Sequence, residues 1–263
     1  MITLSELAIY PIKSTAQIQL NKATMSPFGL DMDRRWMLVD DKGVMLTQRK
    51  HAKMCLIHSV LSESGLLLSA SSMPTLIVPE PDTSSAVLAT VWEDTCNAFD
   101  CGDEAAKWFS EFLNTTAHLV YFPDNEQRQV DLTYAKKGDI TAFSDGFPYL
   151  LISQASLDDL NSRLDKPVEM KRFRPNLVVK GTEAFAEDKW KKIRIGDITF
   201  NLVKPCSRCV IPSIDPDTAN KSAEPVKTLA SYRMRENKIF FGQNVIAEGM
   251  GQLEVGMPVE VIE

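Results

Sequence analysis

Apolar and polar residues alternate along much of the first hundred positions of the chain. Alternation places every second side chain on one face of a strand, so it predicts half-buried β-structure. Turn residues separate the apolar stretches at Asp40-Asp41-Lys42-Gly43 and again at residues 62–65, which indicates hairpins. The predicted strands cover residues 4–10, 36–39, 55–61, 66–70, 75–78 and 86–92. Short strands at regular spacing are typical of a barrel or a sandwich.

Helical periodicity appears first at residues 104–113, with Asp103 as the expected N-cap. The polar, weakly patterned residues 123–142 are the expected connection between two domains. Beyond it the pattern is mixed. The predicted elements are a strand at 149–152, a helix from Ser156 to about Leu164, a strand at 176–179, a hairpin formed by 193–195 and 198–203, a helix at 224–233 with Pro225 in its first turn, and a strand at 259–262.

These patterns predict a β-rich mixed α+β fold with two modules. Residues 1–122 are expected to form a β-rich N-terminal module, residues 123–142 to connect the two modules, and residues 143–263 to form a second β-rich domain with a few peripheral helices. The chain has 263 residues, of which 44% are hydrophobic. A chain of that size builds a sufficient core without disulfides or a structural metal.

Charge and hydropathy narrow the classes of partner. The formal net charge of -6 disfavours nucleic acid and anionic membranes, so an anion would need a local basic pocket. The N-terminus lacks the features of a signal peptide, and no apolar run reaches the length of a transmembrane helix. The five cysteines are odd in number and irregularly spaced, unlike a secreted disulfide framework. We therefore expect a cytoplasmic protein that binds neither nucleic acid nor membrane.

The strongest candidate for chemistry is Cys206-Ser207-Arg208-Cys209. A zinc site would need two further ligands. Cys96 and Cys101 have the right chemistry, but their four-residue gap and their position in the N-terminal half argue against this site. A thioredoxin-like motif should open a helix, but β-branched residues and a proline follow. In a third interpretation one thiolate binds a soft metal carried by a cofactor, with Arg208 lowering the thiol pKa. Two buried structural cysteines remain the alternative without function.

Basic residues accompany short polar side chains at the ends of several predicted strands. Arginine forks bind phosphate in a bidentate manner, and hydroxyls and amides complete such a cradle. Each residue alone is more typical of a solvated surface. No glycine-rich phosphate loop is present, which disfavours a nucleotide-binding fold. The clusters are Lys13-Ser14, Arg34-Arg35, Arg49 after Thr47-Gln48, and Arg172, Arg174 and Asn176.

Asp215-Pro216-Asp217-Thr218 follows the cysteine pair by six residues. It is either a plain turn that begins with an Asx residue or a place where Asp215 orients a ligand or hydrogen-bonds a substrate. The three histidines are scattered and have no spacing suited to a metal.

Taken in order along the chain, these motifs resemble the MOSC superfamily in its two-part form. The segments that carry the resemblance are Tyr10-Pro11-Ile12-Lys13-Ser14, Asp33-Arg34-Arg35-Trp36, Phe173-Arg174-Pro175-Asn176, Pro205-Cys206-Ser207-Arg208-Cys209, Asp215-Pro216-Asp217-Thr218 and Phe241-Gly242-Gln243. The superfamily includes bacterial proteins that reduce N-hydroxylated compounds and the mitochondrial amidoxime reducing component. The resemblance runs from about residue 2 to residue 262. It implies a β-barrel-like N-terminal module over residues 1–122 and a MOSC β-barrel domain over residues 143–263.

The resemblance implies a molybdenum cofactor, with molybdenum on a pyranopterin dithiolene (molybdopterin). By this likeness Cys209 is the molybdenum ligand and Cys206 a supporting residue. The positions that match cofactor-binding residues are Lys13, Ser14, Arg34, Arg174, Asn176, Ser207 and Arg208. Asp215 matches an acidic turn beside the metal and is assigned to catalysis. Relatives often have Thr-Thr-Val where this chain has Pro212-Ser213-Ile214, so the substrate pocket is expected to differ.

The activity implied is reduction of small N-hydroxylated compounds, namely hydroxylamino nucleobases, hydroxylamines and amidoximes, to the amine or amidine. Many bacterial relatives carry a ferredoxin-like domain, whereas no cysteine follows Cys209 here. We therefore expect electrons from a separate ferredoxin-like or flavoprotein donor. We also expect a monomer. The alternatives are a sulfur or cofactor carrier with a persulfide on Cys209, and a non-catalytic protein stabilised by zinc.

Overall fold

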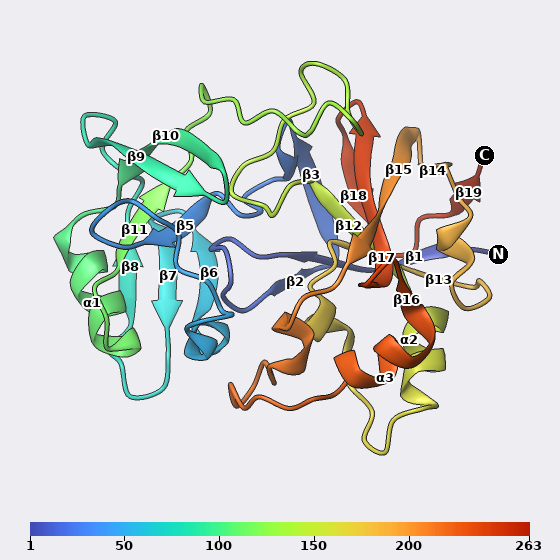
Figure 1. The fold of residues 1–263 in the computed structure, drawn as a ribbon. Helices are drawn as coiled ribbons and strands as arrows, with labels where there is room; N and C mark the ends of the chain where they lie inside the picture. Colours follow the sequence, from blue (N-terminus) through green and yellow to red (C-terminus); the bar gives the residue numbers. More distant parts are fainter.

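Two β-rich bodies lie side by side in the computed structural model, which describes residues 1–263 (Figure 1). The larger body is built on a nine-stranded sheet. Its strands are, in spatial order, β19 (Val259–Val261), β14 (Lys192–Ile195), β15 (Ile198–Ser207), β17 (Lys238–Glu248), β12 (Tyr149–Ser153), β13 (Leu177–Lys180), β1 (Thr3–Ile9) and β2 (Ile18–Leu20), with β16 (Met234–Arg235) paired to β17. Only β12 and β13 pair in parallel; the other pairs in this sheet are antiparallel.

Three smaller sheets complete the β-structure. The first contains β5 (Trp36–Val39), β11 (His118–Tyr121), β10 (Asp94–Asp100) and β9 (Ala86–Val91) in that order. The second contains β6 (His58–Ser62), β7 (Gly65–Ser69) and β8 (Leu76–Val78), and the third contains β18 (Gln252–Glu254), β3 (Lys22–Ser26) and β4 (Gly29–Leu30). The β-rich fold class predicted from alternation is confirmed.

Helices are few and lie at the periphery. They are α1 (Asp103–Leu113), α2 (Gln154–Asn161) and α3 (Val226–Arg233), with 3₁₀ helices η1 (Ala52–Leu56), η2 (Met170–Phe173), η3 (Ala186–Asp188) and η4 (Ile211–Ser213). Helix α1 places Ala105, Trp108 and Phe109 in the core of the smaller body. No helix combines the length and the hydrophobicity that crossing a bilayer requires.

The structure corrects three details of the predicted elements. Asp103 is the first residue of α1 rather than its N-cap, because Gly102 occupies that position with a left-handed backbone that needs no side chain. Helix α2 starts two residues before Ser156, since the Ser153 hydroxyl accepts the Ser156 N–H at 3.1 Å and caps the helix. The strand expected over residues 55–61 begins only at His58, because η1 occupies its first part.

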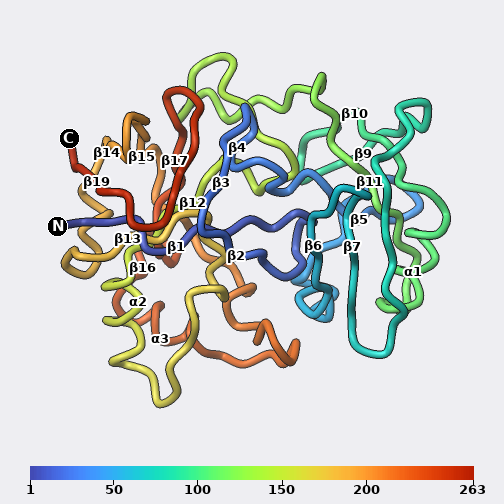
Figure 2. The backbone as a smooth tube through the Cα atoms, turned by 180° about the vertical axis from the view of Figure 1, so that it is seen from behind, coloured from blue at the N-terminus to red at the C-terminus, as the bar shows by residue number.

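The chain does not run through one body and then the other. Strand β1 pairs with β13 and β3 pairs with β18, so the first thirty residues belong with the second half of the sequence. The chain then builds the smaller body from β5 to β11 and returns through a segment without a named helix or strand before β12 (Figure 2). The domain boundaries at 122 and 143 stay a prediction, since the sheet pairing crosses them.

Candidate functional site

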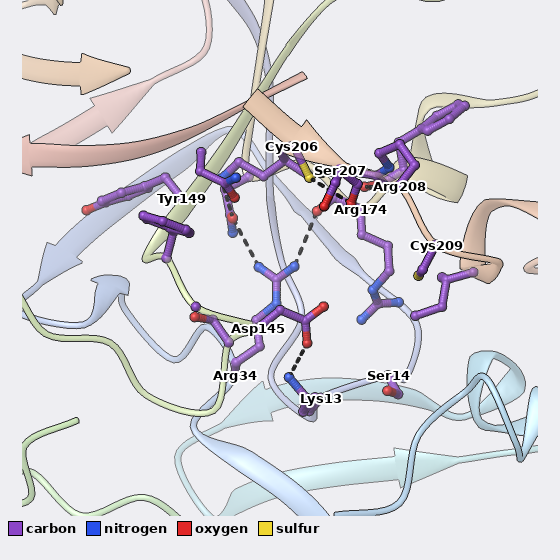
Figure 3. Close-up of a pocket in the computed structure, with 18 of the residues that line it drawn as sticks. Lys13, Ser14, Arg34, Asp145, Tyr149, Arg174, Cys206, Ser207, Arg208 and Cys209 are labelled. Atoms are coloured by element: carbon purple, nitrogen blue, oxygen red, sulfur yellow. Dashed lines mark hydrogen bonds and ion pairs between the residues drawn. The ribbon is translucent and has the colours of Figure 1, made fainter. Parts of the chain in front are cut away.

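One pocket collects basic side chains from distant parts of the sequence; we call it the cationic pocket. Figure 3 shows Lys13, Arg34, Arg174 and Cys209 gathered around it. Its lining consists of Lys13, Ser14, Arg34, Arg49, Ser144, Asp145, Gly146, Phe147, Tyr149, Leu150, Phe173, Arg174, Asn176, Cys206, Ser207, Arg208, Cys209, Ile211 and Asn244. The pocket therefore brings together every cofactor-binding residue predicted from the sequence.

Three of the lining residues have a left-handed backbone, although none is a glycine. The φ angle is 73° at Ser14, 50° at Arg34 and 58° at Arg174. This conformation costs about 1–2 kcal/mol per residue for an L-amino acid and is retained at functional sites when surrounding contacts enforce it. Here the Arg34 N–H donates to the Tyr10 carbonyl at 3.0 Å, and Arg174 is the C-cap of η2. The strained backbone turns these side chains into the pocket.

Tyr10 holds two guanidinium groups close together. The Cζ atoms of Arg34 and Arg174 lie 4.2 Å and 4.1 Å from the centroid of its ring. Cations over an aromatic face are stabilised by the ring quadrupole, which offsets part of their mutual repulsion. Burial raises the pKa of Tyr10, so the phenol stays neutral at physiological pH. The result is two adjacent positive charges facing one pocket.

Arg34 and Asn176 join the two halves of the sequence beneath the pocket. The Arg34 guanidinium donates to the Asp33 carboxylate at 2.5 Å, to Asn176 Oδ1 at 3.0 Å and to the Arg174 carbonyl at 3.2 Å. The Asn176 Nδ2 donates in turn to the Ala8 carbonyl at 3.1 Å. Asn176 is only 2% exposed, so its amide positions Arg34 as well as lining the cavity.

Lys13 is a buried ammonium with two acceptors. Its Nζ donates to the Phe143 carbonyl at 2.7 Å and to Asp145 Oδ1 at 2.5 Å. Burial lowers the pKa of Lys13 to about 8, and the adjacent carboxylate of Asp145 only partly opposes this shift. Lys13 is therefore positively charged at neutral pH and loses its charge in mildly alkaline solution.

Anion binding by the cationic pocket is expected to weaken as pH rises through about 8, the pKa of Lys13. Sulfate keeps its charge over this range, so calorimetric titration of the cofactor-free protein with sulfate measures the effect.

The stability of the fold depends on the same group. Lys13 keeps its proton up to pH 10.5, the ordinary pKa, in the unfolded chain, whereas it loses the proton near pH 8 in the folded chain. The unfolded state then holds more protons, so this group makes stability rise with pH between the two values.

A Lys13→Met variant is the control for this pH dependence. It removes the titrating group and should flatten both the sulfate affinity and the stability change over that interval. A wild-type sulfate affinity that does not change between pH 7 and pH 9 would contradict the prediction.

The end of β15 and the segment that follows it carry the two cysteines, Cys206 and Cys209, into the pocket. The Arg208 N–H donates to the Ile239 carbonyl at 2.7 Å, which fixes the chain where the strand ends. Its guanidinium donates to the Phe173 carbonyl at 2.7 Å and to Cys206 Sγ at 3.2 Å. Cys209 follows as a half-buried free thiol that lines the cavity. No α-helix begins here; the short η4 helix follows, unlike a thioredoxin-like motif.

Asp215 is the one predicted site residue that does not line the pocket. Its carboxylate accepts from Arg172 at 2.6 Å and from the N–H groups of Asp217 and Thr218, each at 3.0 Å. These bonds close the turn expected from an Asx residue and tie it to η2 through Arg172. The carboxylate is therefore occupied with shaping the segment that follows Cys209.

The remaining thiols lie outside the pocket. Burial raises the pKa of Cys55 and Cys96 to about 11 and that of Cys101 to about 12, so all three stay protonated at neutral pH. No group of three or more histidine, cysteine or carboxylate side chains is placed to hold a metal ion. The zinc site completed by Cys96 and Cys101 is therefore not formed, because both residues belong to the smaller body.

Three residues that line the pocket or support its lining were not predicted as site residues. Tyr10 was named only as part of a motif, and Asp145 lies in a segment without hydrophobic periodicity. Trp92 ends a predicted strand, and nothing in the sequence around it indicated a pocket. Only the exposed tryptophan at a predicted strand end was a usable signal, since loops that present aromatic residues often carry function.

The charges define what the pocket can bind. Five cations line it, namely Lys13, Arg34, Arg49, Arg174 and Arg208, and Asp145 is the only carboxylate. The Nε atoms of Arg49 and Arg208 are buried without a hydrogen-bond partner. Buried donors are normally satisfied, so these point to a missing acceptor. Fold and site together define a β-rich protein whose cationic pocket has the charge to bind an oxyanion beside a half-buried thiol.

Comparison with known proteins identifies the family. The MOSC N-terminal beta barrel domain matches residues 1–116 and the MOSC domain matches residues 139–260. Mitochondrial amidoxime-reducing component 1 of Mus musculus is 35% identical over 280 residues, which cover 99% of this chain and 82% of that protein. Mitochondrial amidoxime reducing component 2 of Bos taurus is 37% identical over 276 residues, covering 98% and 82%. The chain belongs to the MOSC superfamily in its two-part form, as its motifs indicated.

Proposed function

We propose that this protein is a molybdenum-cofactor-dependent reductase of N-hydroxylated compounds. The relatives named amidoxime-reducing components, at about 35% identity over nearly the whole chain, support the reaction class. The observation that carries the proposal is the combination of five cations with the free thiols of Cys206 and Cys209 in a single pocket. Amidoximes, hydroxylamines and hydroxylamino nucleobases are the substrates we infer.

The donor set of the cationic pocket fits such a cofactor. A terminal phosphate and a pterin need charged donors together with small polar groups, and the unpartnered Nε of Arg208 is a donor without an acceptor. The residues that would hold the cofactor are Lys13, Ser14, Arg34, Arg174, Asn176, Ser207 and Arg208. Cys209 would supply a thiolate to molybdenum, a soft ligand suited to that metal.

When bound, the cofactor supplies the two-electron reduction of the N–O bond. The chain contributes orientation and electrostatics. Arg34 and Arg174 are held in place by Tyr10, so little reorganisation is needed when an anion binds. Asp145 keeps the Lys13 ammonium directed into the pocket. The overall reaction consumes two electrons and two protons per N–OH group and releases water, and we infer that a separate ferredoxin-like or flavoprotein donor supplies the electrons.

Asp215 is proposed as a positioning residue rather than as an acid or base. It acts through Arg172 and the turn at residues 215–218, which shape the chain beyond Cys209. This role replaces direct participation in catalysis, because its carboxylate does not reach the pocket lining.

Metal content and benzamidoxime reduction test the proposed function together. We expect protein from a host that makes the cofactor to contain stoichiometric molybdenum and to reduce benzamidoxime to benzamidine with a reduced dye as donor. Protein from a host that lacks the cofactor is the control and should be inactive. Sulfane sulfur on Cys209 without molybdenum would instead support the sulfur or cofactor carrier.

A further inference from the structure

Arg49 differs from the other four cations of the pocket. Lys13, Arg34, Arg174 and Arg208 each donate to protein acceptors within hydrogen-bond distance. The Arg49 guanidinium has no ion pair or hydrogen bond inside the protein, and its Nε is buried without a partner. A desolvated donor without an acceptor is costly, and a bound ligand would supply what is missing.

Trp92 is the contact that holds the Arg49 side chain. The Arg49 Cζ lies 4.4 Å from the centroid of the indole ring. The Trp92 Nε1 donates to Asp145 Oδ1 at 3.3 Å, so the indole also contacts the carboxylate that anchors Lys13. The indole thereby connects Arg49 to the wall of the pocket.

The backbone of Trp92 is strained. It follows β9 in the two-residue loop before β10 and has a φ angle of 57°. A bulky residue in this conformation is an outlier, and such strain is retained mainly where the side chain serves a purpose. The side chain is 38% exposed, which places it at the edge of the pocket rather than in the core.

Arg49 also lies where the two bodies meet beside the cysteine segment. Its carbonyl accepts from Lys221 Nζ at 3.4 Å, and Lys221 pairs with Ile214 just after η4. A few residues on, Cys55 Sγ donates to the Asp215 carbonyl at 3.5 Å. The turn that carries Arg49 is therefore packed against the segment that follows Cys209.

We propose that Arg49, supported by Trp92, binds an anionic substituent of the substrate. The inference rests on the proposed function and names its substrate class: N-hydroxylated compounds that carry a carboxylate or a similar oxyanion. A guanidinium binds a carboxylate through two parallel hydrogen bonds between opposite charges. A neutral substrate cannot form this interaction. The partial exposure of Trp92 places this contact at the entrance, where a substrate rather than a buried cofactor reaches it.

The test compares benzamidoxime with 4-carboxybenzamidoxime on the molybdenum-loaded enzyme. The wild-type enzyme should have the higher kcat/KM for the carboxylated compound. In Arg49→Gln the ratio of the two values should fall on the order of tenfold, the usual cost of losing a charge-assisted hydrogen bond. Trp92→Leu should lower the ratio less, because the guanidinium remains but is no longer held.

Lys50→Gln is the matched control, since it removes the same charge from the adjacent exposed residue. It should leave the ratio at the wild-type value. Calorimetric titration with the product 4-carboxybenzamidine gives a readout without turnover. Its affinity should fall in Arg49→Gln, fall less in Trp92→Leu and stay unchanged in Lys50→Gln.

Two results would overturn the inference. One is an equal ratio in wild type and Arg49→Gln; the other is loss of molybdenum from Arg49→Gln with an equal fall for both substrates, which would assign Arg49 to the cofactor. Failure of the proposed function looks different, because then the wild-type enzyme with its molybdenum reduces neither compound.

Discussion

Replacing Cys209 by serine is expected to abolish reduction of benzamidoxime while the protein stays folded. The thiol lies half-buried at the lining of the cationic pocket and makes no contact on which the fold depends. Serine differs by one atom, but its hydroxyl is much less acidic than a thiol, and its oxygen is a harder ligand than a thiolate sulfur. We expect kcat to fall by roughly 10³-fold or more, the scale seen when an essential group is removed. Steady-state kinetics with a reduced dye as electron donor measure this fall in kcat.

Cys101→Ser is the matched control for that substitution. Cys101 is another partly buried thiol of the chain, but it packs against the core of the smaller body away from the pocket. Its activity should stay near the wild-type value. Circular dichroism and melting temperature confirm that both variants are folded. Substantial reduction by Cys209→Ser with bound molybdenum would refute the ligand assignment.

Arg34→Met is expected to cost about 3 kcal/mol of unfolding free energy, because it leaves a buried carboxylate without its partner. The Arg34 side chain is 13% exposed and that of Asp33 only 2%, and their atoms lie 2.5 Å apart. The Tyr10 N–H at 2.8 Å is the one remaining donor to Asp33. Urea unfolding of the wild type and the variant measures the difference. Sulfate affinity should fall as well, since one of two adjacent guanidinium groups is gone.

A double substitution shows whether the stability lost in Arg34→Met comes from the broken ion pair with Asp33 or from lost side-chain packing. In Arg34→Met with Asp33→Asn the carboxylate is neutral, so most of the stability should return while sulfate binding stays weak. If the double variant is as unstable as Arg34→Met alone, the buried charge is not the cause. A stable single variant would show that the pair contributes little.

Single strands and hairpins could be predicted from the sequence because they depend on residues that are neighbours in the chain. The strand predicted at residues 36–39 matches β5, although its four residues are all apolar and buried and do not alternate. The turn at Gly196-Asp197 correctly predicted the hairpin of β14 and β15. Capping and 3₁₀ structure were less predictable. Ser153 and Ser156 are both good N-caps, and the choice depends on the buried Glu187 carboxylate, which accepts from both residues.

Motif order predicted the candidate site better than spacing did. Ser14, Arg34 and Arg174 are far apart in the chain, and no hydrophobic periodicity predicts that they lie together. The family resemblance assigned all three to one cofactor site. Asp145, Trp92 and Arg49 were not assigned because their roles depend on tertiary contacts alone. Asp215 was predicted as a catalytic residue, but its carboxylate contacts Arg172 and does not line the pocket, which a turn beside a cysteine motif does not reveal.

The pairing of β1 with β13 has a consequence for synthesis on the ribosome. Ser5 and Val178, joined across these strands, are 173 residues apart, so β1 emerges long before its partner exists. At about 5–20 residues per second, that interval lasts roughly ten seconds or longer. Throughout it an apolar strand edge is open to pairing with other chains. Trigger-factor-like holdases that cover nascent apolar segments should therefore raise the yield of native protein, and the smaller body can mature first.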